Sequence, residues 1–133
     1  MNNKGFTLIE LLTVIVLLSI ISIISFVSIN AVINKNKDND CVSLVMSIKS
    51  AIEEYISDNR YNSEFTDLVI ENNITLSGSV LANNGYLKGE IVNPYNNDVI
   101  SYGDISAKIT LYDDYTVASI SINSPEFLNT CQK

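Results

Sequence analysis

The chain has 133 residues, a formal net charge of −7 and a hydrophobic content of 47%, and it contains neither histidine nor tryptophan. This length allows one small domain and one membrane anchor. Without histidine, a Cys-x-x-Cys pair or a glycine-rich phosphate loop, the common catalytic constellations are excluded, so we expect no enzyme, no catalytic residue, no cofactor and no metal site. The acidic balance also argues against direct nucleic-acid binding.

The first predicted element is an apolar helix that reaches from Phe6 to Ile29, with Glu10 as its only charge. At about 1.5 Å per residue, the run is about 36 Å long, which is enough to cross about 30 Å of hydrocarbon. Lys4 and the amino terminus precede it, which keeps that end in the cytoplasm and exports the rest. Because no clear small-x-small cleavage site follows, we expect the mature protein to retain this helix.

Glu10 is the most informative residue of this run. A carboxylate at the centre of a bilayer costs about 2.5 to 3.5 kcal/mol on insertion scales, so its presence suggests a functional pairing. The alternative is a glutamate near a helix end whose carboxylate reaches the membrane surface. Serines at positions 19, 22, 25 and 28 would either let neighbouring helices approach closely or bond back to their own helix.

The helical pattern continues beyond the membrane segment, because neither proline nor glycine occurs between Phe6 and Gly78. We expect one helix from Phe6 to about Asp58, with a polar segment at Asn34–Asp40 that could fray or bend. Its second half has an apolar stripe opposite Lys49, Glu53 and Glu54. The stripe consists of Val32, Ile33, Cys41, Val42, Val45, Ile48, Ile52, Tyr55 and Ile56.

Shorter elements follow. Ser63 is a candidate cap for a short helix through Ile70, and residues 80–84 are predicted to form a second short helix or a loop. Asn93–Asp98 is rich in turn residues. Residues near Val99 to Tyr102 could form a strand, with less support than the hairpin that comes next.

The clearest strand signal is a hairpin of Ala107–Tyr112 and Tyr115–Ile122, joined by two aspartates. A two-residue loop pairs Leu111 with Thr116, Ile109 with Ala118 and Ala107 with Ile120. These pairs form an apolar face, which is expected to cover the helix stripe. The predicted fold class is therefore α+β, with a long N-terminal helix packed against a small antiparallel sheet.

Cys41 and Cys131 both lie in the exported part, where a disulfide can form. Such a bridge would close a loop of about 90 residues and stabilise the fold by about 4.5 kcal/mol through loop-closure entropy. The alternative is two unpaired thiols in a reducing setting.

The leader ending in Gly5, the run Phe6-Thr7-Leu8-Ile9-Glu10 and the apolar helix after it resemble the class III signal of type IV prepilins and pseudopilins. The resemblance implies that a prepilin peptidase cleaves between Gly5 and Phe6 and methylates the new amine of Phe6. It also implies that Glu10 pairs with the amine of a neighbouring subunit during assembly. The physical argument agrees, because joining a buried carboxylate to a buried ammonium removes two desolvation problems together.

The resemblance also implies a division of the chain and a set of partners. The leader would occupy residues 1–5, the transmembrane and assembly half of the helix residues 6–30, and the exported pilin-like domain residues 31–133. A single-pass precursor in the plasma (inner) membrane would then enter an extracellular pilus or pseudopilus. The implied partners are further copies of the chain, other pilins, the prepilin peptidase and the pilus assembly machinery in the membrane.

The middle of the chain is similar to pilins in a weaker pattern, Gly85-Tyr86-Leu87, then Asn93-Pro94-Tyr95, then Tyr102. Asn93 stands where the family has aspartate, so calcium binding is not carried over. Cys41 also departs from the family, whose common disulfide closes a C-terminal loop. Three functions therefore stay open: a major or minor pilin, a pseudopilin of a competence or type II secretion system, and a monomeric membrane-anchored binding domain.

Overall fold

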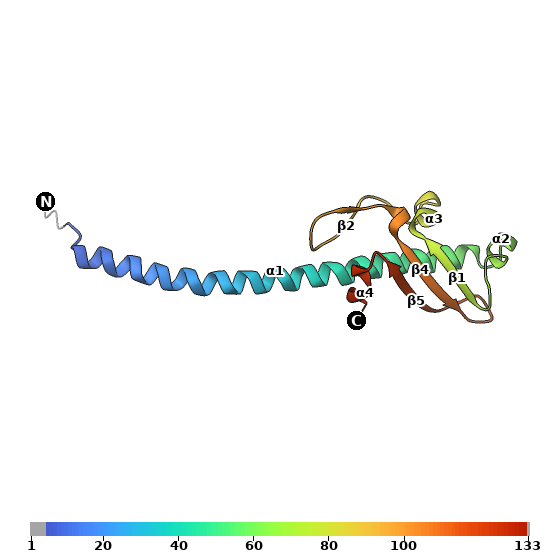
Figure 1. Ribbon diagram of the computed structural model, residues 1–133, viewed down its shortest axis with the longest axis horizontal. Helices are drawn as coiled ribbons and strands as arrows, with labels where there is room; N and C mark the ends of the chain where they lie inside the picture. Colours follow the sequence, from blue (N-terminus) through green and yellow to red (C-terminus); the bar gives the residue numbers. More distant parts are fainter. Residues whose placement is uncertain (1–4, 133) are drawn as a thin grey trace. The chain divides into compact units, whose positions relative to one another are not determined.

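The computed structural model describes the backbone of residues 5–132, and the side chains of that range except residues 26–28. The chain divides into two compact units, residues 1–36 and 37–133, and each is described by itself. Helix α1 (Leu8–Asn59) contributes to both units (Figure 1). It begins two residues after the predicted start, and the polar segment 34–40 is helical.

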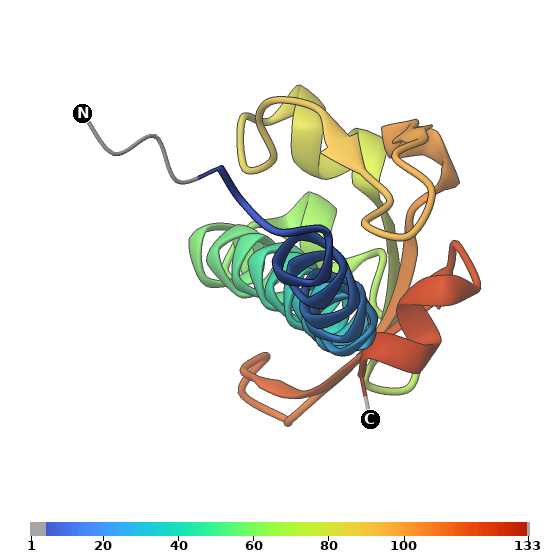
Figure 2. The same cartoon turned by 90° about the vertical axis from the view of Figure 1, so that its left-hand side faces the viewer.

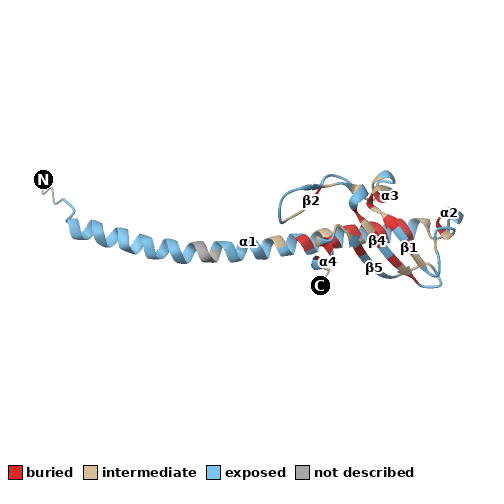
Figure 3. Ribbon diagram, viewed as in Figure 1, coloured by how far each residue is buried: buried red, intermediate tan, exposed pale blue. Residues whose placement is uncertain are grey.

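In the second unit, α1 buries one stripe of side chains (Figure 3). Its members recur at steps of three and four residues, which places them on one face of a helix. The prediction was wrong for Val32, Ile33 and Val42, which are exposed, and it omitted Ala51, which is buried. The buried stripe consists of Cys41, Val45, Ile48, Ala51, Ile52, Tyr55 and Ile56.

The main sheet covers this stripe with three antiparallel strands in the order β1–β4–β5, and Figure 2 shows it on one side of the helix. The strands are β1 (Asn73–Ser77), β4 (Ser106–Leu111) and β5 (Val117–Ser124). Alternate residues of β1 and β4 are buried, as expected for a sheet with one face on the core. The predicted α+β class, a long N-terminal helix packed with a small antiparallel sheet as in pilins, is confirmed.

The pairing of β4 with β5 differs from the predicted register. Ile109 lies opposite Ile120 and Ala107 lies opposite Ile122, a shift of two residues along β5. The cause is the turn, in which Tyr112 N–H donates to the Thr116 carbonyl over 2.8 Å and Tyr115 adopts a left-handed φ of 61°. A three-residue loop of this kind takes one residue more than a two-residue turn. The register irregularity between Thr110 and Leu111 completes the shift.

The third strand of the main sheet was also misassigned. β1 takes that place, whereas β3 (Val99–Ile100) pairs with β2 (Ile91–Val92) in a separate two-stranded sheet. The predicted helix after Ser63 is shorter than expected, and Asn62, not Ser63, is its N-cap. The remaining elements are α2 (Ser63–Thr66), α3 (Gly78–Asn83), the 3-10 helix η1 (Tyr102–Asp104) and α4 (Phe127–Cys131).

Candidate functional site

The first turn of α1 is closed by reciprocal hydrogen bonds between Thr7 and Glu10. The main-chain N–H and the Oγ1 hydroxyl of Thr7 donate to Glu10 Oε2 over 2.8 and 3.0 Å. The Glu10 N–H donates to Thr7 Oγ1 over 3.3 Å. This arrangement is a capping box, which satisfies N–H groups that a helix end leaves unpaired. Thr7 was not predicted as part of the site, although the Thr-x-x-Glu spacing is the signal that identifies it.

The box leaves half of the Glu10 carboxylate available. Both bonds from Thr7 end on Oε2, and within the described residues Oε1 accepts no hydrogen bond. A carboxylate has acceptor sites on both oxygens. Glu10 can therefore cap its own helix and accept a hydrogen bond from another donor at the same time.

The predicted cleavage point lies just before this turn. Gly5, Phe6 and Thr7 precede the first helical residue, and all three are exposed. An exposed segment without regular secondary structure is the usual site of proteolysis. The structure thus places Gly5, Phe6 and Glu10 in one short segment at the start of α1.

The first half of α1 is an apolar surface. Every residue from Gly5 to Ser25 is exposed, and the helix is long and apolar enough, by length and composition, to cross a membrane. The hydroxyls of Ser19, Ser22 and Ser25 donate to the carbonyl four residues earlier, over 2.7 to 2.9 Å. These three serines thus bond back to their own helix, the second of the two expectations, while the Ser28 side chain lies outside the described residues.

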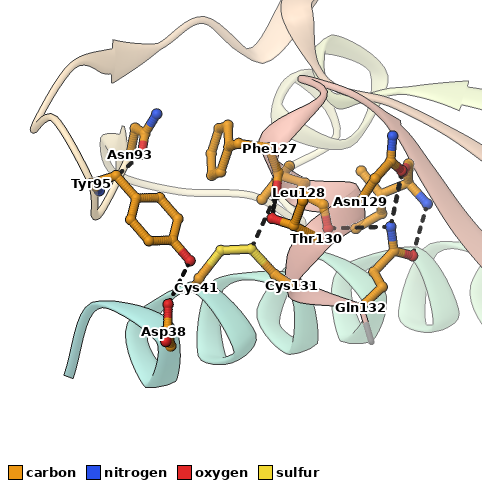
Figure 4. The surroundings of a disulfide bond; sticks show 11 residues. Asp38, Cys41, Asn93, Tyr95, Phe127, Leu128, Asn129, Thr130, Cys131 and Gln132 are labelled. Atoms are coloured by element: carbon orange, nitrogen blue, oxygen red, sulfur yellow. Dashed lines mark hydrogen bonds between the residues drawn. A yellow bond between two sulfur atoms is a disulfide. The ribbon is translucent and has the colours of Figure 1, made fainter. Parts of the chain in front are cut away.

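A disulfide joins Cys41 of α1 to Cys131 at the end of α4 (Figure 4). The two Cα atoms are 5.5 Å apart, within the range that a disulfide spans. Both cysteines are buried. The bridge fixes the C-terminal helix α4 to the part of α1 with which the second unit begins.

The loop between β2 and β3 lies beside this disulfide and forms hydrogen bonds with α1 close to Cys41. The Tyr95 hydroxyl donates to Asp38 Oδ1 over 2.9 Å (Figure 4). Lys37 Nζ donates to the Tyr95 carbonyl over 3.3 Å. The Tyr95 ring also makes an edge contact with Phe127 of α4, with the centroids 6.4 Å apart. The hydrogen bond to Asp38 raises the pKa of Tyr95.

A second tyrosine, Tyr86 in the segment between α3 and β2, contacts α1 near the C-terminal end of that helix. The Tyr86 hydroxyl donates to Asp58 Oδ2 over 2.9 Å, and its ring meets Tyr55 edge-on at 5.4 Å. The hydrogen bond to Asp58 raises the pKa of Tyr86. The Tyr102 hydroxyl donates to the Gly89 carbonyl. Tyr86, Tyr95 and Tyr102 are the tyrosines of the weaker resemblance to pilins. Their contacts hold the segment between α3 and β4 in place.

The asparagine-rich turn closes on itself. Asn96 Nδ2 donates to Asp98 Oδ2 over 2.6 Å, and the Tyr95 N–H donates to Asn93 Oδ1 over 2.9 Å. Across the described part of the chain, no group of three or more His, Cys, Asp or Glu side chains is arranged to hold a metal ion.

Residues 1–26 match the family model of the prokaryotic N-terminal methylation motif, which is consistent with the type IV pilin family. The motif supports a type IV pilin-like or pseudopilin precursor. The motif implies processing by a prepilin peptidase and assembly with pilins, and it suits a membrane-anchored structural subunit better than an enzyme. No curated protein and no solved structure matches this pilin-like chain.

Proposed function

We propose that the chain is a structural subunit of a type IV pilus or a related filament, assembled through its N-terminal helix. The observation that carries the proposal is the methylation motif over residues 1–26, with Glu10 at the start of an exposed apolar helix. An apolar surface of this extent requires cover by lipid or by other helices. A membrane-inserted precursor and a helical filament provide these two environments in succession.

Processing creates the second charge of the assembly site. Cleavage between Gly5 and Phe6 leaves an ammonium on Phe6, four residues before Glu10, and methylation retains its positive charge. Each subunit then carries one cation and one anion at similar depths in the membrane. An ion pair between the Phe6 amine of one subunit and the Glu10 Oε1 of its neighbour lowers the desolvation cost of both.

We also propose the domain division that the motif suggests, with a leader at residues 1–5, an assembly helix at 6–30 and an exported domain at 31–133. In this scheme the Cys41–Cys131 disulfide forms after export. It joins the C-terminal end of the exported domain to the helix, so that subunits entering a filament have one fixed shape.

Two conservative substitutions separate the assembly role of Glu10 from its capping role. Glu10→Gln retains a carbonyl oxygen that can accept from Thr7 but removes the charge. Thr7→Val removes the hydroxyl of the capping box and leaves the charge in place. We expect both variants to be cleaved, Thr7→Val to form filaments and Glu10→Gln to form none that shearing and electron microscopy detect. Normal filaments from Glu10→Gln would refute the pairing.

Cell fractionation distinguishes a pilus subunit from a pseudopilin and from a monomeric anchored domain. A pilus subunit is expected in material sheared from the cell surface, whereas a pseudopilin stays with the envelope. A monomeric anchored domain stays in the membrane and gives no ladder of cross-linked multimers. Cross-linked multimers that are confined to the envelope would therefore favour the pseudopilin over the pilus.

A further inference from the structure

A cavity of about 250 Å³ opens in the exported unit where the end of α1 meets the β4–β5 turn. Glu53, Ser57 and Arg60 line it from the helix side, and Tyr115 and Val117 line it from the turn. The cavity is smaller than the usual volume of sites for small organic ligands, about 300 to 1,000 Å³. Its size fits one inserted side chain.

Arg60 is the only arginine of the chain. Its Nε atom is buried and, among the described residues, makes no hydrogen bond. Its guanidinium carbon lies 4.7 Å from the centre of the Tyr61 ring. An arginine that stacks on a ring can still present the N–H groups at the edge of its guanidinium plane to a carboxylate.

Asp114 interacts electrostatically with Arg60 and Glu53 lines the same cavity, but neither carboxylate forms an ion pair with Arg60 in the described part of the chain. Asp114 Oδ1 accepts from the Thr116 hydroxyl over 2.6 Å and from the Thr116 N–H over 3.0 Å. These bonds, with a smaller contribution from the Arg60 charge, lower the pKa of Asp114. Glu53 lines the cavity but forms no ion pair with Arg60 in the structure. A buried, unpaired donor on a charged group is unfavourable unless a further partner binds there.

We infer that Arg60 binds a carboxylate side chain of a second copy of this chain, inserted into the cavity. The inference rests on the proposed function, because a filament brings copies of the exported domain together. Charge complementarity favours this occupant, since the chain carries 15 acidic residues against 8 basic ones. Tyr61, which stacks on Arg60, is 82% exposed, and tyrosine and arginine dominate the binding energy of many protein interfaces.

Cross-linking of sheared filaments from an Arg60→Lys variant tests the contact directly. The substitution places an amine in the cavity, and a carbodiimide joins an amine to a touching carboxylate as an amide with loss of water. We expect a cross-linked dimer on denaturing gels, with the introduced lysine bonded to an aspartate or glutamate in the peptide mass spectrum. Wild-type filaments are the control, because arginine does not react. Three results would overturn the inference. The introduced lysine cross-links within its own chain, it cross-links only to a small carboxylate, or it forms no cross-link.

Filament yield gives a second readout that does not depend on cross-linking. Arg60→Gln should lower the yield of sheared filaments about tenfold, which corresponds to about 1.4 kcal/mol per contact. Lys49→Gln removes the same charge from the same helix outside the cavity and should change the yield less than about twofold. Processed chain in the membrane verifies that both variants fold. Equal yields from the two variants overturn the inference alone, whereas absence of wild-type filaments overturns the proposed function and the inference with it.

Discussion

At the scale of single residues, the structure shows Glu10 in one arrangement, and our proposal adds a second that uses the other oxygen of the carboxylate. Oε2 accepts both hydrogen bonds from Thr7, and Oε1 is available to the amine of a neighbouring subunit. Its unusual place could be predicted because Glu10 is the only charged residue between Phe6 and Ile29. The two tyrosine–aspartate contacts could not be predicted, because their partners lie 28 and 57 residues apart. The proposed role of Arg60 could not be predicted either, because only the folded structure shows that its Nε atom is buried without a hydrogen-bond partner.

The tyrosines predict how stability changes with alkaline pH. The pKa values of Tyr86 and Tyr95 are raised above 10.0 by their bonds to Asp58 and Asp38. A raised pKa means that the folded state holds the proton more tightly, so this stabilisation is complete below about pH 10 and is lost as the pH rises further. Thermal unfolding of the full chain in detergent, followed between about pH 8 and 11, should show a smaller alkaline decline for the double variant Tyr86→Phe/Tyr95→Phe. The same slope in wild type and variant would contradict the role of these bonds.

At the scale of elements, the sheet register decides which side chains of β5 enter the core. Ile122 is fully buried opposite Ala107, whereas Ala118 is exposed. The alternation of apolar residues was enough to predict the hairpin and its buried β4 residues. It could not predict the register, because a left-handed Tyr115 is not recognisable from composition and adds a residue to the turn. β1 was missed because Asn73–Ser77 is short and mostly polar.

Substitutions on β5 distinguish the two registers. Ile122→Ala should lower the free energy of unfolding by about 2 to 5 kcal/mol, because it leaves a cavity in the core. Ala118→Ser should change it by less than about 0.5 kcal/mol, because the site is exposed. Denaturant titration of the full chain in detergent measures both. A costly Ala118→Ser would instead support the two-residue turn, which places Ala118 opposite Ile109 on the apolar face.

The disulfide is the covalent link between α4 and α1. It spans a sequence separation of 90 residues, so its removal should lower the free energy of unfolding by about 4.5 kcal/mol. Cys131→Ser and chemical reduction of the wild type should shift the denaturation midpoint by similar amounts. Ser121→Ala, an exposed change on β5, serves as the control. An unchanged midpoint on reduction would show that the bridge does not stabilise the second unit.

At the scale of the whole molecule, a helix that follows the methylation motif continues into a second compact unit with its own core. The family motif covers residues 1–26, and the long apolar helix that begins at Leu8 could be predicted from the sequence. The second unit could be predicted only as a helix with a hairpin, because its other contacts join segments distant in the sequence. We propose that the single arginine of the chain is one feature by which one subunit recognises the next.

The most direct test of the filament role is the intact mass of the chain recovered from sheared surface material, measured without reduction. We expect a chain that begins at Phe6, carries one added methyl group, and lacks two hydrogens because Cys41 and Cys131 are bonded. The same chain found only in the membrane, with Met1 retained or with its N-terminus near Ala31, would contradict assembly through the N-terminal helix.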